Sequence, residues 1–241
     1  MDLGERSTGP LAAAVTRVAS SRLFSGTSKG RVGLPPLSNE LLKGSERRLW
    51  DLVAERARPG ADVGAVDRRI WDLFGETWTV MFTDLSGFSR QVEEFGILHF
   101  LQIIHEHKSL LAPIIQGHDG ILIKVEADSL IVIFRRAASA VRCAVAMQES
   151  VRVFNRSRTP ATDILLCVGI GHGAILRIGD SDVYGQEVNA ASKLGEDTAK
   201  SGEVLLTKAA VLSAGPIDGV EFERIDARVG GSAENYRLLI L

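Results

Sequence analysis

The sequence predicts an α+β domain of the ferredoxin-like type, because apolar strand patterns and helical patterns alternate along most of the chain. From Trp78 onward the pattern predicts a strand at 78–84, a helix at 87–117 broken near Gly96, and strands at 120–126 and 129–135. There follow a helix at 136–156, a hairpin-like pair of strands within 164–179, a helix at 186–199 and a strand at 203–207. Strand, helix, two strands, helix, strand is the ferredoxin-like order. A short helix and two weaker strands, near 219–225 and 234–240, complete the expected domain at 78–241.

The first 37 residues predict a disordered N-terminal tail. They are rich in Ser, Gly and Arg, have no sustained apolar period, and end in Gly33-Leu34-Pro35-Pro36. Five basic residues and no acidic one occur between Arg6 and Ser38, which is also typical of an organelle transit peptide. Asp2 and Glu5, however, stand where such a peptide avoids acids. We therefore expect a cytoplasmic protein with a solvated tail, and organelle targeting is the alternative.

Residues 38–77 predict a helical N-terminal extension. It contains an internal echo, Arg47-Arg48-Leu49-Trp50-Asp51-Leu52-Val53 and Arg68-Arg69-Ile70-Trp71-Asp72-Leu73-Phe74, with Pro59-Gly60 between the copies. Each copy puts an apolar stripe on one helix face, which indicates packing but does not identify the partner. The two interpretations are a pair of helices packed on the main domain and a segment for dimerisation or signal transmission.

The composition argues against several classes of function. Lys and Arg number 28 and Asp and Glu number 30 among the 241 residues, so the formal charge of −2 gives no general attraction to nucleic acid or to an acidic membrane. No apolar run approaches the roughly 20 residues of a membrane-spanning helix. Cys143 and Cys167 lie in apolar surroundings, and we expect buried free thiols.

Two aspartates follow apolar runs and predict a metal-dependent phosphate site. The run that begins at Val80 ends in Asp84, and a Ser86-Gly87 turn follows directly. Backbone N–H groups at such a helix start can face a phosphate, and the neighbouring carboxylate can hold a divalent cation. Asp128 supplies a second carboxylate 44 residues later, between two apolar runs. If the strand at 78–84 lies beside the hairpin, both carboxylates reach one end of the sheet and can bridge two cations. Either aspartate alone is equally well explained as a cap or turn residue.

A second candidate cluster lies on the helix predicted at 186–199. Asn189 and Lys193 are four residues apart and share a helix face, so an amide and a cation point the same way and suit a developing negative charge. From spacing alone an ordinary solvated helix face explains them equally well. His105 and His107, two residues apart on a predicted helix, face differently and indicate solvated or capping roles rather than a metal site.

Three ordered motifs resemble the class III nucleotidyl cyclases. Phe82-Thr83-Asp84-Leu85-Ser86-Gly87-Phe88 is similar to the family's F-T-D-[IL]-x-G-F, and Lys124-Val125-Glu126-Ala127-Asp128 to its K-x-x-G-D. The stretch from Asp182-Val183-Tyr184-Gly185 to Val188-Asn189-Ala190-Ala191-Ser192 resembles D-x-[WFY]-G-x-x-V-N-x-A-S-R. The resemblance covers about 78–210 and implies the fold of the cyclase catalytic domain.

The resemblance also implies a role for each matching residue. Asp84 and Asp128 would bind two Mg²⁺ or Mn²⁺ ions, Asn189 would position the ribose and the nucleophile, and Lys193 stands at the position of a transition-state arginine. The substrate-binding residues would be Phe82, Thr83, Leu85, Ser86, Gly87, Phe88, Lys124, Asp182 and Arg228. Among these, backbone N–H groups of 85–88 would hold the triphosphate, and Lys124 and Asp182 would read the base. Lys can donate to a ring nitrogen of adenine and Asp can accept from its exocyclic amine, whereas guanine reverses that polarity.

Two residues depart from the family pattern. Lys193 replaces a planar five-donor fork with a point charge, which is not a neutral exchange at a phosphate. Ala127 replaces Gly in the turn before Asp128, and its Cβ is tolerable if φ is negative and costly if φ is positive.

The function that the resemblance implies is conversion of ATP to 3′,5′-cyclic AMP and pyrophosphate by an adenylyl cyclase. The family acts as a head-to-tail dimer, so a homodimer of this chain would have two equivalent sites, each built from both subunits. The alternatives are a cyclase for GTP or a pyrimidine triphosphate, and a cyclase-like module that binds nucleotide and dimerises without turnover.

Overall fold

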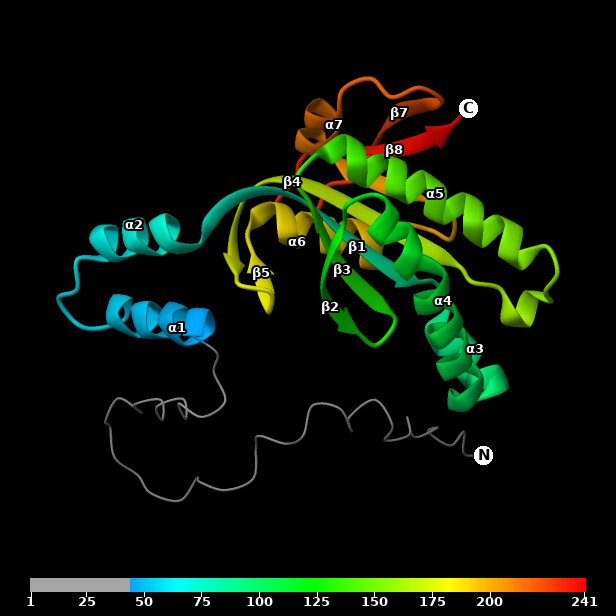
Figure 1. Ribbon diagram of the computed structural model, residues 1–241, viewed down its shortest axis with the longest axis horizontal. Coiled ribbons are helices and arrows are strands. Elements are labelled where there is room, and N and C mark those ends of the chain that lie inside the picture. Colours follow the sequence, from blue (N-terminus) through cyan, green and yellow to red (C-terminus); the bar gives the residue numbers. More distant parts are fainter. Residues whose placement is uncertain (1–43) are drawn as a thin grey trace, which may run out of the picture. The chain divides into compact units, whose positions relative to one another are not determined.

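The structure is a computed structural model that describes residues 44–241, apart from the side chains of residues 88–91 (Figure 1). The predicted tail at 1–37 and the first residues of the predicted extension lie outside the described residues. The elements in chain order are α1 (Gly44–Arg56), α2 (Val63–Phe74), β1 (Gly75–Leu85), α3 (Phe88–Phe95), α4 (Ile97–Gly117), β2 (Ile121–Glu126), β3 (Ser129–Phe134), α5 (Ala137–Asn155), η1 (Pro160–Thr162), β4 (Leu166–Ile178), β5 (Asp182–Tyr184), α6 (Gln186–Ser192), η2 (Lys193–Thr198), β6 (Val204–Thr207), α7 (Lys208–Ala214), β7 (Val220–Ile225) and β8 (Asn235–Ile240).

The described strands form one eight-stranded sheet with β1 near its centre. The order is β2-β3-β1-β4-β6-β8-β7, and β5 pairs with β4 outside this path. β1 is antiparallel to both β3 and β4, with Phe82 opposite Ile131 on one side and Gly169 on the other. The first four strands of that order, β2-β3-β1-β4, have the arrangement of a ferredoxin-like sheet. The two strands that precede helices, β1 and β3, lie side by side at its centre. The predicted fold class is therefore confirmed.

Alternating side chains of β1 divide the core between the two faces of the sheet. Met81 and Leu85 belong to a buried cluster that includes residues of α4, α5 and α7. Trp78 and Val80 belong to a second cluster on the opposite face, which includes Val188 of α6. Successive residues of a strand point to opposite faces, so a strand buried on both faces reads as a continuous apolar run. This is why the stretch at 78–85 is the clearest strand signal in the sequence.

The predicted hairpin within 164–179 is wrong, because these residues form the single 13-residue strand β4. The glycines of this strand allow close packing. A Cβ at Gly169 would collide with the backbone of Ala191 and Gly195, and a Cβ at Gly171 would collide with the backbone of Glu187. Alternate glycines on one face thus let α6 and η2 lie directly on the backbone of β4. We call Gly169, Gly171 and Gly173 the glycine strip.

The helix predicted at 186–199 is divided in the structure. α6 is α-helical to Ser192, and the six residues of η2 from Lys193 onward form a π-helix. π-Helical turns inside helices are rare and occur frequently at functional sites. The break predicted near Gly96 is present, since Gly96 has φ of 85° between α3 and α4.

The two helices of the extension pack on each other and on the C-terminal end of β4. Leu52 of α1 and Ile70 and Phe74 of α2 share a buried cluster with Ile178 of β4. Figure 1 shows α1 and α2 side by side at one end of the sheet. Among residues 44–241, no helix combines the length and the apolar character that crossing a membrane requires.

His107 departs from the solvated or capping role that the sequence indicated. It is 0% exposed on α4, and in the described part of the chain neither ring nitrogen has a hydrogen-bond partner. Burial, followed by the charge of Lys108, lowers the pKa of His107 to about 4, so the ring is neutral near pH 7. Cys143 and Cys167 are buried free thiols, as predicted.

Candidate active site

The two predicted metal-binding aspartates lie together. Asp84 is the penultimate residue of β1, and Asp128 lies in the turn between β2 and β3. The Ser129 hydroxyl donates to Asp84 Oδ1 at 3.2 Å. Burial raises the pKa of Asp84 to about 6, and the neighbouring charge of Asp128 acts in the same direction. Burial also raises the pKa of Asp128, while the backbone amide of Leu85 lowers the pKa of both carboxyl groups. Two half-buried carboxylates that repel each other beside one amide form a site short of positive charge.

This arrangement fits a divalent cation. Mg²⁺ prefers oxygen ligands and is commonly held by one or two carboxylates, with substrate phosphates and waters completing its coordination. In the described residues no three His, Cys, Asp or Glu side chains are grouped to hold a metal, so the aspartates stand as a pair. A carboxylate pair of this kind suits a cation that a polyphosphate substrate helps to bind.

The side chains of Phe82, Thr83 and Leu85, around Asp84, are buried in the fold. Phe82 and Leu85 are buried in the two apolar clusters. Thr83 is fully buried, and its hydroxyl accepts from the backbone N–H of Leu130, which ties β1 to β3. The Ser86 N–H donates to the Leu165 carbonyl at 2.9 Å, so it is engaged within the chain. Gly87 has φ of 87°, the left-handed conformation that favours glycine, and is the N-cap of α3.

Lys124 and Asp182 are brought together from distant parts of the sequence. Lys124 Nζ lies 3.3 Å from Asp182 Oδ2, and it also contacts Glu126 Oε1. The Tyr184 hydroxyl donates to the same Asp182 oxygen at 3.3 Å. The hydrogen bond to Glu126 is the largest cause of the raised pKa of Lys124, and the charge of Asp182 adds to it. The residues predicted to read a base therefore form one partly exposed cluster of compensated charges.

The polar residues of α6 and η2 take separate partners. The Asn189 amide donates to the Gly230 carbonyl at 2.6 Å, and Lys193 Nζ lies 2.6 Å from Asp197 Oδ2. The first contact ties α6 to the loop between β7 and β8, in which Arg228 is exposed and lines a hollow of about 230 Å³. Lys193 is half exposed, so its ion pair is open to solvent.

Ala127 has φ of 48°, the left-handed conformation that favours glycine. It directly precedes Asp128 in the turn between β2 and β3. The costly case for this departure from the family pattern therefore applies.

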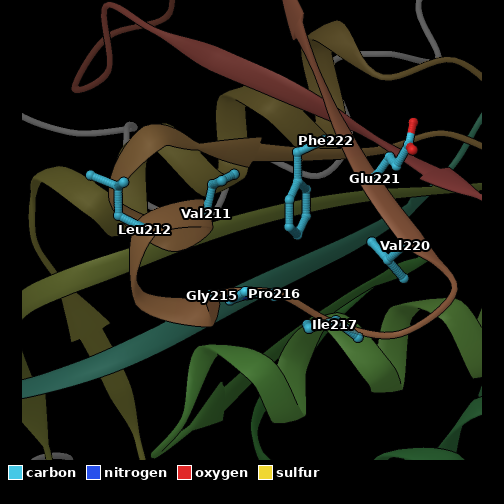
Figure 2. Close-up of a pocket in the computed structure, with 8 residues that line it drawn as sticks. All are labelled: Val211, Leu212, Gly215, Pro216, Ile217, Val220, Glu221 and Phe222. Carbon is cyan, nitrogen blue, oxygen red and sulfur yellow. The ribbon is translucent and has the colours of Figure 1, made fainter.

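A larger hollow lies away from these residues. The groove in Figure 2, of about 470 Å³, is bordered by α7 and by β7 with the segment that precedes it, and Val211, Ile217 and Phe222 are among its mostly apolar lining residues. Glu221 is the one charged residue of that lining. Without converging polar groups it offers no chemistry for a nucleotide.

Several contacts at the candidate site were not expected from the motifs. Ser129 donates to Asp84, Glu126 contacts Lys124, and Tyr184 donates to Asp182. Glu187 accepts from the backbone of His172 and from the Thr207 hydroxyl. Ser129 could have been found from its place directly after Asp128. Tyr184 stands at the aromatic position of the motif that begins at Asp182, and its contact with Asp182 could have been found from their spacing of two residues on a strand. The partners of Glu187 come from separate elements, and sequence spacing gives no sign of them.

Comparison with known proteins agrees with this geometry. The chain is 30% identical over 135 residues to the serine/threonine-protein kinase pkn2 of Myxococcus xanthus, covering 56% of this chain and 16% of that protein. It is 25% identical over 151 residues to adenylate cyclase 1 of Rhizobium meliloti, covering 56% of this chain and 23% of that protein. The chain thus spans less than a quarter of the length of these relatives.

Solved structures show the same fold. The adenylyl cyclase CyaB from P. aeruginosa superposes with a TM-score of 0.59 at 21% identity, covering 69% of this chain and 95% of that one. The guanylyl cyclase Cya2 superposes with a TM-score of 0.54 at 19% identity, covering 68% and 90%. Residues 74–236 match the adenylate and guanylate cyclase catalytic domain, and the chain belongs to that family.

Proposed function

We propose that this domain is an adenylyl cyclase, which converts ATP to 3′,5′-cyclic AMP and pyrophosphate. The observation that carries the proposal is the contact between Lys124 and Asp182, a cationic donor beside an anionic acceptor on a partly exposed surface. Adenine offers a ring-nitrogen acceptor beside an amino donor, which is the complementary pattern. Guanine offers a carbonyl and a ring N–H at the equivalent edge, and both would face groups of the wrong polarity.

Asp84 and Asp128 are the residues that would hold two Mg²⁺ or Mn²⁺ ions, since they meet half-buried at the end of β1. When bound, such ions neutralise the polyphosphate and lower the pKa of the ribose 3′-hydroxyl, which attacks the α-phosphorus in line. The backbone at Gly87 and Phe88, at the start of α3, is suited to a phosphate oxygen. Ser129 would keep Asp84 oriented toward the cations.

Asn189 and Lys193 are the candidates for contacts with the reacting groups. The Asn189 amide donates to Gly230, and a rotation would make it available to the ribose. Lys193 would supply positive charge to the phosphates after release from Asp197, and Arg228 would add a second cation from the loop that Asn189 touches. Exposed ion pairs are worth only about 0–1 kcal/mol, so the release costs little.

The site is proposed to form between two copies of this chain. The contacts divide the site residues into local groups, with Asp84 and Asp128 in one and Lys124 and Asp182 in another. A two-fold dimer joins the metal group of one subunit to the base-reading group of the other and yields two equivalent sites. A mixture of an Asp84→Asn chain with an Asn189→Ala chain should then regain activity, because one composite site of the heterodimer is intact. Folded, exchanging mutants that stay inactive together would exclude the shared site.

The reaction is tested with the purified protein, Mn²⁺ and each of the four ribonucleoside triphosphates. We expect cyclic AMP and pyrophosphate from ATP, identified by mass spectrometry, and little product from the other three. The Asp84→Asn protein is the control for contaminating cyclase. If another cyclic nucleotide forms in larger yield than cyclic AMP, the corresponding triphosphate is the substrate and not ATP.

A second candidate function is a cyclase-like module that binds nucleotide and dimerises without turnover. The observation in its favour is that Lys193, where the family has arginine, is exposed and paired with Asp197. If Lys193 contacts the transition state, Lys193→Ala should lower kcat by about 10²–10³-fold with little change in KM. Asp197→Ala, which leaves the lysine in place, should not lower kcat. A Lys193→Ala protein with kcat within twofold of wild type would remove the catalytic role of this lysine.

A further inference from the structure

The carboxylate of Asp182 is held at both oxygens. Its Oδ1 accepts the backbone N–H of Val183 at 2.9 Å. Its Oδ2 accepts from Lys124 Nζ and from the Tyr184 hydroxyl, each at 3.3 Å. The tyrosine is therefore a second side-chain donor to the group that is proposed to read the base.

The pairing of β5 explains why these side chains meet. Asp182, Val183 and Tyr184 form a short strand antiparallel to β4, with Asp182 opposite Ile178 and Tyr184 opposite Leu176. Residues two apart on a strand share a face, so Asp182 and Tyr184 point to one side while Val183 is buried on the other. Gly185 ends the strand at φ of 159°, where a Cβ would press on the backbone of Ala174 and Ile175. The backbone pairing of β5 with β4 therefore holds Tyr184 beside Asp182.

The donors around Lys124 complete the arrangement. A lysine ammonium has three N–H donors. One faces Glu126 and another faces Asp182, which leaves one for an acceptor outside the chain. The Asp182 carboxylate offers acceptors only, and its two oxygens are held by the backbone N–H of Val183, the ammonium of Lys124 and the hydroxyl of Tyr184. The cluster therefore presents one donor and one acceptor in fixed relative positions.

We propose that Tyr184 is a positioning residue for base selection, whose hydroxyl holds the Asp182 carboxylate in the orientation that accepts the amino group of a 6-aminopurine. This inference rests on the proposed function, since it assumes that the base of the nucleotide binds at the cluster. The phenol does not touch the reacting atoms. Its loss frees the carboxylate to rotate and to bind water, so discrimination between adenine and guanine falls while the fold is kept.

The chain offers a matched control in its other tyrosine. The Tyr236 hydroxyl donates at 2.6 Å to Glu234, which is also an acidic residue two positions earlier, and this pair lies on β8 and the segment before it. Tyr236→Phe removes the same group from the same local geometry, away from the base-reading cluster.

The test is equilibrium binding with Mg²⁺ present, measured by calorimetry for wild type, Tyr184→Phe and Tyr236→Phe. The probes are 3′-deoxy-ATP and 3′-deoxy-GTP, which lack the attacking hydroxyl and cannot be cyclised. We expect the wild type to prefer the adenine probe. Tyr184→Phe should reduce that preference by about three- to tenfold, the value of one hydrogen bond to a charged group near the surface. Tyr236→Phe should keep it within twofold of wild type.

Each outcome decides between the inference and the function. An unchanged preference in Tyr184→Phe, or an equal loss in both variants, overturns the positioning role even when the wild type cyclises ATP. A selective loss in Tyr184→Phe supports it even if no cyclic AMP forms, in which case the proposed reaction fails alone. A wild type that binds both probes equally overturns the positioning role, and the product assay with ATP decides the proposed function separately.

Discussion

Asp84 and Asp128 form one group of the candidate site, Lys124, Asp182 and Tyr184 form another, and the charges of the two groups are balanced in opposite ways. Asp84 and Asp128 face each other half-buried, and burial raises the pKa of both. Asp182 instead receives an ammonium, a hydroxyl and a backbone N–H. In the first group burial outweighs the charge of Lys108, which acts on Asp128, whereas the second group contains an ammonium of its own. A bound cation should therefore change the protein most at the first group, and substitutions at the second should change selectivity.

Asp84→Asn should give the largest effect and should act in opposite directions on activity and stability. A neutral amide holds Mg²⁺ poorly, so cyclase activity should be abolished. In the metal-free protein the same change removes the repulsion with Asp128 and should raise the melting temperature by about 2–4 °C, roughly 1 kcal/mol. Melting in EDTA and in Mn²⁺ measures this, with Asp218→Asn on an exposed turn as the control. A wild-type rate in Asp84→Asn would contradict the metal assignment.

The free energy of unfolding of the metal-free protein should depend on pH through Asp84. The pKa of Asp84 in the folded chain is about 6, above the ordinary aspartate value near 3.9. The folded protein therefore binds this proton more tightly than the unfolded chain, and the stability from Asp84 is present below about pH 4 and lost as the pH rises through 6. Asp84→Asn should flatten this part of the stability profile, and Mn²⁺ affinity of the wild type should increase from pH 5 to pH 7. A profile that Asp84→Asn leaves unchanged would place the titration elsewhere.

Asp182→Asn should have a smaller effect, on selectivity. The amide keeps the shape but is no longer an obligate acceptor, so preference for ATP over GTP in kcat/KM should fall by about 10–100-fold, the value of a hydrogen bond to a charged group. Thermal stability should change little, because the cluster is partly exposed. A selectivity equal to wild type would show that the base binds elsewhere.

His107 is a buried side chain whose two ring nitrogens have no hydrogen-bond partner among the described residues. His107→Leu should raise the free energy of unfolding by about 1–3 kcal/mol, because two unpartnered nitrogens are removed from the core. The folded pKa of about 4 lies below the ordinary histidine value near 6.5, so stability from the neutral ring is lost as the pH falls from 6.5 through 4. The variant should lose less stability on acidification. Denaturant unfolding at pH 5 and 7 measures this, with His105→Leu at an exposed position as control, and an equal acid loss in both variants would refute it.

Ala127→Gly should give the smallest effect. Ala127 directly precedes Asp128 and follows Lys124 by three residues. Glycine relieves the left-handed strain but adds entropy to the unfolded chain, so a net gain of about 0.5–1 kcal/mol is expected. Asp119→Gly is the matched control, since Asp119 has φ of 59° and aspartate tolerates this region better than alanine. Equal shifts in the two variants would mean that strain at Ala127 is not special.

Much of this arrangement could be predicted because it depends on local patterns. The strand at β1 was predictable from a continuous apolar run, and the meeting of Asp84 with Asp128 followed from placing that strand beside a hairpin. The long strand β4 was not, because the glycine strip has the composition of a turn and only the approach of α6 explains it. The hydrogen bond of Ser86 to Leu165 and the burial of His107 were also beyond the sequence, since both depend on contacts between separate elements.

The glycine strip makes β4 a mechanical link between the extension and the candidate site. α1 and α2 contact the strand at Ile178, and α6 with Asn189 rests on its backbone at the strip. A helix that lies on side chains can shift while those side chains repack, but one that lies on backbone must move with the strand. Any displacement of α1 and α2 that bends or twists β4 would therefore also carry Asn189 with it, because no layer of side chains lies between the helix and the strand at Gly169 and Gly171 to absorb the motion.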